Sequence, residues 1–295
     1  MKLNIAIVTN NQLHHNYFAS EINKYCNVKC IIIPEGDEIE SSILQKIKQQ
    51  GFIIVLLKIL SKIYSKFNKN TMPHLLKKAS IDFFENSKSE FEKIDKSKIH
   101  FIKTVNSEIG INIIKTNEID IICFLGGDIS KNNFISSAKI ACLNIHSGIS
   151  PFYNGAGSSA WTVADYRPNF AGVTLMKMNE RIDGGDIISH FLPSINQNDN
   201  AATLFMKGII GGTELVKTEI NNYENGEFFS GLPQKKSFKY TKGIEWNIYH
   251  DIRLENFHKS GRMKIYTRNQ NSFYYNNESD SKKFQFHHVL NYILN

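Results

Sequence analysis

Three side chains suited to acid–base chemistry occur in two short segments of the chain. Asn144 and His146 end an apolar run, and Asp183 stands before two glycines further along the chain. Because side chains alternate between the two faces of a strand, residues 144 and 146 point in the same direction. An amide donor, an imidazole that titrates near neutrality and a carboxylate that orients it would form a proton-transfer site. The same spacing also fits a strand end, a turn and a hairpin without a catalytic function.

The elements that must position these residues alternate between strands and helices. Short, apolar, β-branched runs predict strands over residues 3–9, 28–33, 100–103, 119–125, 141–146 and 187–192. Apolar residues at three- and four-residue spacing predict helices over residues 14–24, 39–49, 52–67, 73–93, 108–116 and 200–224. We expect the last helix to be interrupted at Gly211 and Gly212. The first strand, helix and strand form a βαβ unit, which requires a parallel sheet.

The predicted fold class is therefore α/β, with a Rossmann-like, mostly parallel sheet, helices on both faces and a smaller C-terminal subdomain. A length of 295 residues and a hydrophobic content of 41% suit one large unit with an appended piece. We assign residues 1–212 to a catalytic domain with a helical insertion at about 40–95. Residues 213–295 would form a subdomain for dimerisation or acceptor binding. No G-x-G-x-x-G motif follows the first strand, which counts against an NAD-dependent dehydrogenase.

Composition argues against several other classes of protein. No run approaches about 18 apolar residues and no cleavable leader begins the chain, so we expect neither a membrane partner nor secretion. The four cysteines are scattered, and Cys26 and Cys30 have no second Cys/His pair nearby, so we expect reduced thiols, no metal and a cytoplasmic protein. The net charge of +7 comes mainly from residues 55–100, which favours a solvated helix face over a nucleic-acid-binding surface.

Small and polar residues end two of the predicted strands. Gly126, Gly127 and Asp128 follow the strand over 119–125, and Asn144 and His146 end the strand over 141–146. In an open parallel sheet, ligands bind beyond the carboxyl ends of the strands. Both groups are therefore expected at one crevice, which strengthens the case for a functional site.

Three segments, in order, resemble the core signature of the N10-formyltetrahydrofolate-dependent formyltransferases. They are Asn144-Ile145-His146, the loop over 147–155 (SGISPFYNG) and the segment over 182–187 (IDGGDI). This family includes the glycinamide ribonucleotide, methionyl-tRNA and sugar N-formyltransferases. The resemblance covers residues 100–212 well and 1–35 loosely. The chain departs from the family pattern at Ser147-Gly148, at Ser150 and at Asn154, where the family usually has Pro-Ser, Leu and Arg.

The resemblance implies a task for each of the three side chains. An amine would attack the formyl carbon of N10-formyltetrahydrofolate, and Asn144 would donate to the developing oxyanion, a contribution of about 3–4 kcal/mol in comparable sites. His146 would stabilise that oxygen or move a proton, and Asp183 would orient His146 and help to deprotonate the amine. No metal is implied. By the same analogy, the formyl donor would contact Phe124, Leu125, Gly126, Gly127, Asp128, Ile129 and Ile182.

The expected acceptor is a small-molecule amine, by analogy a nucleotide-linked amino sugar. Residues 213–295 hold twelve basic and nine acidic side chains, a small excess for methionyl-tRNA, and glycinamide ribonucleotide enzymes are typically shorter. His14, Tyr153 and Trp161 are candidates for substrate contacts, although aromatic residues in such a loop also anchor it by packing. By resemblance, Pro151 is a candidate cis proline and a homo-oligomer is expected. A catalytically silent folate- or nucleotide-binding protein is the alternative.

Overall fold

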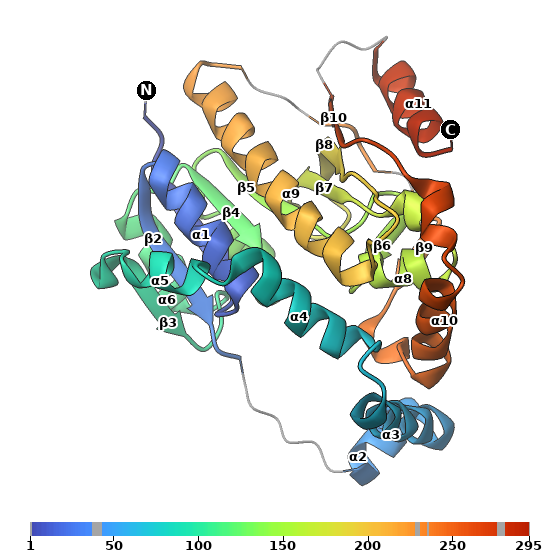
Figure 1. Cartoon of the computed structure of the whole chain (residues 1–295). Helices are drawn as coiled ribbons and strands as arrows, with labels where there is room; N and C mark the ends of the chain where they lie inside the picture. Colours follow the sequence, from blue (N-terminus) through green and yellow to red (C-terminus); the bar gives the residue numbers. More distant parts are fainter. Residues whose placement is uncertain (1, 37–42, 228–230, 235, 276–280, 295) are drawn as a thin grey trace.

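An eight-stranded sheet forms the centre of the computed structural model, which describes residues 2–36, 43–227, 231–234, 236–275 and 281–294 (Figure 1). The strand order is β10-β8-β7-β5-β4-β1-β2-β3. The strands are β1 (Ile5–Thr9), β2 (Val28–Pro34), β3 (Ile99–Ile102), β4 (Ile121–Leu125), β5 (Ala141–His146), β7 (Val173–Lys177), β8 (Asp186–Leu192) and β10 (Asn271–Tyr274). Neighbours from β3 to β5 in this order are parallel, while β7, β8 and β10 pair antiparallel. The predicted α/β class with a mostly parallel sheet is confirmed.

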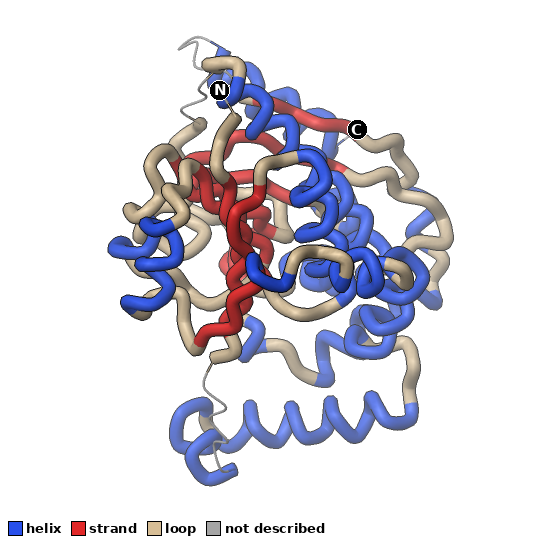
Figure 2. Tube along the Cα trace, turned by 90° about the vertical axis from the view of Figure 1, so that its left-hand side faces the viewer, coloured by secondary structure: helices blue, strands red, loops and turns tan. Residues whose placement is uncertain are grey.

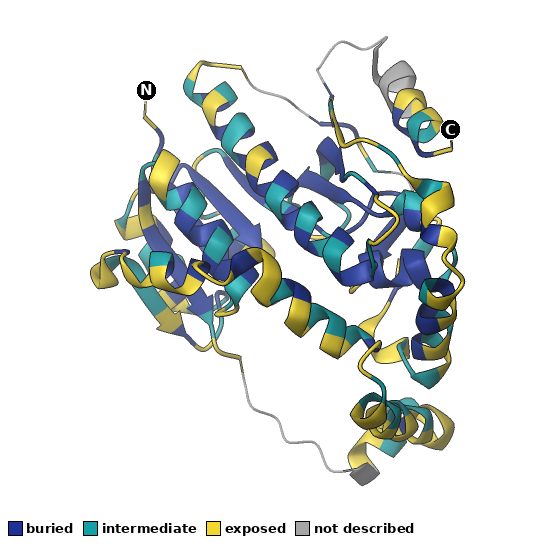
Figure 3. Ribbon diagram, viewed as in Figure 1, coloured by how far each residue is buried: buried dark blue, intermediate teal, exposed yellow. Residues whose placement is uncertain are grey.

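Helices cover both faces of this sheet because its central strands are apolar on both sides (Figures 2 and 3). Ile5 and Ile7 face the layer of α1 (Leu13–Tyr25), α4 (Met72–Phe84), α5 (Ser87–Glu92) and α9 (Ala201–Glu224). Ala6 and Val8 face the opposite layer, which holds α6 (Glu108–Thr116) and α7 (Asn132–Ile135). The strict alternation along β1 therefore separates the core into two layers.

Helix α9 runs without a break across the sheet, so the expected interruption at Gly211 and Gly212 is wrong. A Cβ on Gly211 would lie 2.1 Å from Cδ1 of Phe191, and one on Gly212 would lie 2.7 Å from Cγ2 of Ile145. The two glycines therefore let α9 approach β8 and β5 closely. The expected domain boundary between residues 212 and 213 falls inside this helix.

The region expected as a helical insertion forms four helices rather than three. They are α2 (Ile43–Gln50), α3 (Phe52–Phe67), α4 and α5, since the helix predicted over 73–93 divides after Phe84. The beginning of the helix predicted over 39–49 lies outside the described residues. Helix α4 packs on α1 and α9, whereas α3 packs on α10 (Ile248–Lys259). Helices α2 and α3 lie at the lower end of the molecule in Figures 1 and 2.

The chain after α9 returns to the main body. Strand β9 (Lys239–Thr241) pairs in parallel with β6 (Tyr153–Gly155), and β10 joins the main sheet beside β8. The Ser150–Pro151 peptide bond is cis, as the family resemblance suggested. No helix in the described part of the chain is long and apolar enough to cross a bilayer. The remaining elements are α8 (Ser158–Ala164), α11 (Ser281–Leu294) and the short 3-10 helices Lys96–Lys98, Pro168–Phe170, Gly243–Glu245 and Arg262–Tyr266.

Candidate active site

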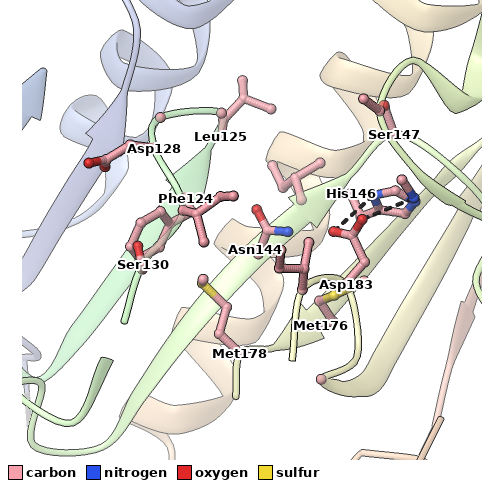
Figure 4. A pocket seen from close by; sticks show the side chains of 18 of the residues that line it. Phe124, Leu125, Asp128, Ser130, Asn144, His146, Ser147, Met176, Met178 and Asp183 are labelled. Carbon is pink, nitrogen blue, oxygen red and sulfur yellow. Dashed lines mark hydrogen bonds and ion pairs between the residues drawn. The ribbon is translucent and has the colours of Figure 1, made fainter. Parts of the chain in front are cut away.

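A cavity of about 530 Å³ lies where β4 and β5 end. It brings together all the residues predicted for catalysis and for donor binding, and one predicted substrate residue: Asn144, His146, Asp183, Phe124, Leu125, Gly126, Gly127, Asp128, Ile129, Ile182 and His14. Residues from the ends of two adjacent parallel strands therefore meet at one place, as expected for an open α/β sheet. Figure 4 shows this cavity from close by.

The imidazole of His146 lies between two oxygen acceptors (Figure 4). Its Nδ1 is 3.4 Å from Oδ1 of Asp183, and its Nε2 is 3.0 Å from the carbonyl oxygen of Tyr153. A carbonyl oxygen only accepts, so Nε2 carries a proton and donates it to Tyr153. The carboxylate opposite Nδ1 then favours a second proton on the ring. The geometry therefore favours an imidazolium–carboxylate pair.

The electrostatics of the pair agree with this geometry. Burial by itself lowers the pKa of His146, but the Asp183 carboxylate and the Tyr153 carbonyl outweigh burial, and the pKa is raised above its usual value. Burial by itself raises the pKa of Asp183, but His146 and the Gly155 amide outweigh it, and this pKa is lowered. The side chains of His146 and Asp183 are only 5% and 15% exposed, so solvent screens the pair weakly.

A tight turn between β7 and β8 carries Asp183 to His146. Asp183 has a φ of 49°, in the left-handed region that Asp tolerates better than most residues. The Gly155 amide donates to Oδ2 of Asp183 at 3.0 Å and fixes the carboxylate. A Cβ on Gly185 would lie 2.0 Å from the carbonyl oxygen of Lys177. The second glycine after Asp183 is therefore needed for the turn that returns the carboxylate to the cavity.

Asn144 lies in the same cavity, and in Figure 4 its amide is placed between the Phe124 ring and the Asp183 carboxylate. The alternation expected along β5 holds, because Ile145 is 4% exposed and packs in the core on the face covered by α9. Within the described residues, the structure records no hydrogen bond to the Asn144 side chain. Its amide N–H groups are thus available to a ligand.

Known proteins are similar to this chain in the sequence of its central part and in fold. Residues 87–209 match the family model for formyl transferases. This central part of the chain is therefore similar to the formyl transferases. Methionyl-tRNA formyltransferase from Caldicellulosiruptor saccharolyticus is 28% identical over 160 residues, which cover 54% of this chain and 43% of that protein. The Listeria monocytogenes protein of the same name is 33% identical over 118 residues, which cover 40% of this chain and 38% of that protein. The chain thus spans less than half the length of these two relatives.

Solved structures of formyltransferases have the same fold over most of the chain. A sugar N-formyltransferase from a Shewanella species has a TM-score of 0.52 and 14% identity, covering 86% of this chain and 87% of that one. A 4-N formyltransferase from Francisella tularensis has a TM-score of 0.51 and 16% identity, covering 85% and 86%. At these identities the likeness shows the fold alone. The formyl transferase segment over 87–209 contains Asn144, His146 and Asp183.

Two departures from the formyl transferase signature lie directly against the His146–Asp183 pair. A Cβ on Gly148 would lie 2.3 Å from the carbonyl oxygen of Tyr153 and 2.8 Å from Nε2 of His146. Glycine at this position therefore leaves room for the hydrogen bond between them. The Asn154 side chain donates to the carbonyl oxygen of Asp183 at 3.1 Å and so supports the turn that holds the carboxylate.

The loop after β4 forms one wall of the cavity. Gly126 and Gly127 have φ values of 73° and 91°, which few other residues adopt. A Cβ on Gly126 would lie 2.7 Å from Cε1 of His15, whose Nδ1 is 2.9 Å from Oγ1 of Thr9. The start of α1 therefore supports the glycine turn. The sequence indicated the turn but not the part that His15 has in holding it.

Two of the three residues expected to contact substrate lie elsewhere. The Trp161 ring is buried and packs edge-on against Trp246, at 5.2 Å between ring centroids. Tyr153 is buried as well, and its hydroxyl donates to Asp165 at 3.0 Å, so only its backbone carbonyl reaches His146. Neither side chain is among those that line the cavity. Tyr153 anchors the end of the loop and Trp161 anchors α8, because both rings pack in the same apolar cluster.

The third predicted substrate residue, His14, does line the cavity. Its Nδ1 has no hydrogen-bond partner within the described structure, and burial lowers the pKa of His14 to about 4, so the ring is neutral at pH 7. Among the described residues, no group of three His, Cys, Asp or Glu side chains could hold a metal ion. The sequence did not point to several further lining residues: Met176, Met178, Tyr240, Thr241 and Lys242.

Proposed function

We propose that the protein is an N-formyltransferase that uses N10-formyltetrahydrofolate as formyl donor and a primary amine as acceptor. The observation that carries the proposal is the buried His146–Asp183 pair, which shares a cavity with the Asn144 amide. Burying two charges is costly unless their interaction compensates for the lost hydration. A protein that only binds folate has no evident need for this pair, whereas a transferase needs it to stabilise developing negative charge and to accept a proton.

The residues of the cavity fit the formyl donor. Phe124, Met176 and Met178 offer apolar surface to a flat ring system (Figure 4). Oδ1 of Asp128 and Oγ of Ser130 are buried and have no hydrogen-bond partner in the described part of the protein. Buried polar atoms without partners are rare in folded proteins, so a ligand with donor and acceptor groups is a natural partner here. These residues would hold the ring of the donor.

Each member of the trio has a distinct task in the proposed reaction. When bound, N10-formyltetrahydrofolate supplies the formyl group. Asn144 donates a hydrogen bond to the oxygen on which negative charge develops, and the His146 imidazolium places a positive charge in the same cavity. Asp183 keeps His146 protonated and oriented. Its carboxylate takes up the proton that the attacking amine loses and returns it to N10 as the bond between N10 and the formyl carbon breaks.

We further propose a nucleotide-linked amino sugar as the acceptor. Arg181 and Lys242 line the cavity and supply positive charge for phosphate groups. The neutral imidazole of His14, with its unpaired Nδ1, offers a hydrogen-bond partner to a sugar hydroxyl. Methionyl-tRNA is the second candidate, because the curated sequence relatives named above carry that name. The modest basic excess over residues 213–295 favours the small substrate.

A panel of amines assayed with N10-formyltetrahydrofolate tests the choice of acceptor. It consists of nucleotide-linked amino sugars, glycinamide ribonucleotide and charged initiator methionyl-tRNA, with formyl transfer followed by product mass. We expect turnover with at least one amino sugar. Turnover with the tRNA alone would replace the sugar by the second candidate. Absence of turnover with every amine, combined with tight folate binding, would identify the protein as a catalytically silent folate-binding protein.

Substitution Asp183→Asn tests the proposed chemistry. The variant removes the charge that holds His146 protonated, so we expect kcat to fall by about 10²–10⁴ while the Kd for folate changes little. Asp82→Asn is a matched control, because Asp82 is exposed on α4 and does not line the cavity. An Asp183→Asn variant with the kcat of the control would refute the mechanism.

A further inference from the structure

Helix α3 carries a continuous apolar stripe on the outside of the molecule. Its members recur at the three- and four-residue spacing of one helix face and are between 39% and 87% exposed: Phe52, Leu56, Ile59, Leu60, Ile63 and Phe67. Scattered exposed apolar residues are ordinary, but a contiguous row of large ones marks an interaction surface. Helix α3 lies at the lower edge of the molecule, and its exposed residues are yellow in Figure 3.

The opposite side of α3 is attached to the rest of the protein. Ser61 donates to Asp251 and Tyr64 donates to Glu255, both acceptors lying on α10. These contacts fix the rotation of α3 about its axis. In the described structure, α3 is already attached to α10 by its other side. The stripe is therefore held facing outward.

The charged side chains on α3 itself are all of one sign, while the acidic Asp251 and Glu255 lie on α10 against its other side. Residues 43–71 contain the lysines at 46, 48, 58, 62, 66 and 69 and no Asp or Glu. Lys58, Lys62 and Lys66 follow one another at four-residue intervals, so they form a row along one edge of the stripe. A second copy of the chain docking its own α3 here would bring two such rows together without an acidic partner in either segment. The complementary surface is therefore anionic.

We propose that α3 binds the surface of a bilayer that contains anionic lipids. The helix would lie along the interface, with the stripe at the level of the acyl chains and the lysines among the phosphate groups. A planar surface suits a stripe on a single convex helix at the edge of the protein, whereas a partner protein would need a groove of matching shape. No residue of α3 lines the cavity, so the bound protein keeps its site open.

The sequence predicted no membrane partner because that prediction rested on the absence of a spanning segment. Peripheral binding needs no spanning helix, and the periodicity of residues 52–67 fits a core-facing helix equally well. Only the packing of α3 shows that the apolar side is the exposed one. The proposal is independent of formyl transfer, because none of its measurements uses that reaction.

Flotation of the whole protein with lipid vesicles tests the proposal. We expect the protein to float with vesicles of phosphatidylcholine and phosphatidylglycerol, and not with phosphatidylcholine alone. Raising the salt concentration should release it, because the attraction between lysines and lipid phosphates is screened. Failure to float with the anionic vesicles at low salt would overturn the proposal.

Two double variants separate the apolar and the charged contributions. Leu56→Ser with Ile63→Ser should lower the partition coefficient by at least about tenfold, and Lys62→Gln with Lys66→Gln by about fivefold for each lysine. Circular dichroism and thermal unfolding establish that each variant is folded.

The matched controls change the same residue types elsewhere on the surface. Ile109→Ser alters a side chain that is 64% exposed on α6, and Lys115→Gln with Lys264→Gln removes two charges distant in sequence from α3. We expect both controls to bind vesicles like the unaltered protein. Equal loss of binding in the controls and the α3 variants would refute a specific surface. A dimer that does not float, and that Leu56→Ser with Ile63→Ser converts to a monomer, would identify a second copy as the occupant.

Discussion

A carboxyl group buried in α9 makes the stability of this fold depend on pH. Glu219 is 1% exposed, so its carboxylate is almost completely removed from water. Burial raises the pKa of Glu219 from 4.5 to about 7, and the neighbouring Asn222 side chain offsets only part of this effect. The folded protein therefore favours the protonated carboxyl. We expect Glu219→Gln, which keeps the shape and cannot ionise, to remove this pH dependence.

The sign and size of the effect follow from the two pKa values. Because the pKa is higher in the folded state, that state binds more protons between pH 4.5 and about 7, and the free energy of unfolding falls as the pH rises through this window. The full loss is reached above the folded pKa. The two values differ by 7 − 4.5 = 2.5, which corresponds to about 3 kcal/mol.

Urea unfolding at about pH 5 and about pH 8 measures this contribution. Relative to the unaltered protein, Glu219→Gln should gain about 2–3 kcal/mol on going from the lower to the higher pH. The pH-dependent change is the diagnostic, since a buried amide can add a constant cost at both values. Glu214→Gln on the same helix is the control, because the Glu214 side chain is 57% exposed and should change stability by less than about 0.5 kcal/mol. Parallel pH profiles for Glu219→Gln and the unaltered protein would refute the reasoning.

Two further substitutions test how the site is supported. Gly212→Ala places a Cβ 2.7 Å from Cγ2 of Ile145. We expect the free energy of unfolding to fall by about 1–3 kcal/mol, which exceeds the gain in helix propensity of about 1 kcal/mol. We also expect a lower kcat, because Ile145 lies between the two polar residues of β5. A higher Tm with unchanged kcat would contradict this. Tyr275→Phe removes the hydroxyl that donates to Nδ1 of His190 at 2.6 Å, and thermal unfolding should show a loss of about 1–2 kcal/mol. An unchanged Tm would contradict the structural importance of that bond.

The sequence was a good guide wherever burial and local spacing decide the structure. Strand β5 was predicted at its observed bounds, because its short run is largely apolar and buried. The alternation of Asn144, Ile145 and His146 follows from strand geometry. The break expected at Gly211 was wrong because propensity describes an isolated helix. In the protein, the ring of Phe191 fills the space that a side chain would need, and close packing outweighs the intrinsic cost of glycine.

Contacts between distant segments could not be read from local patterns. Tyr240 and Lys242 reach the cavity because β9 pairs with β6. Both strands are too short, and too ordinary in sequence, for that pairing to be predicted. Trp161 had the right composition and loop for a ligand contact, yet its direction depends on Trp246, which lies far along the chain. Residue type indicated the chemistry of the site, whereas long-range packing decided which side chains reach it.

The buried charges of the protein respond to pH in different ways, and this keeps the proposed measurements separable. The raised pKa of His146 stabilises the fold below its unfolded pKa near 6.5, and this contribution is lost as the pH rises through the folded value. The lowered pKa of Asp183 stabilises the fold above 3.8, and this contribution is lost as the pH falls through the folded value. Both are present in the unaltered protein and in Glu219→Gln, so they cancel in the difference between them. That difference therefore reports on α9, while Asp183→Asn reports on the cavity.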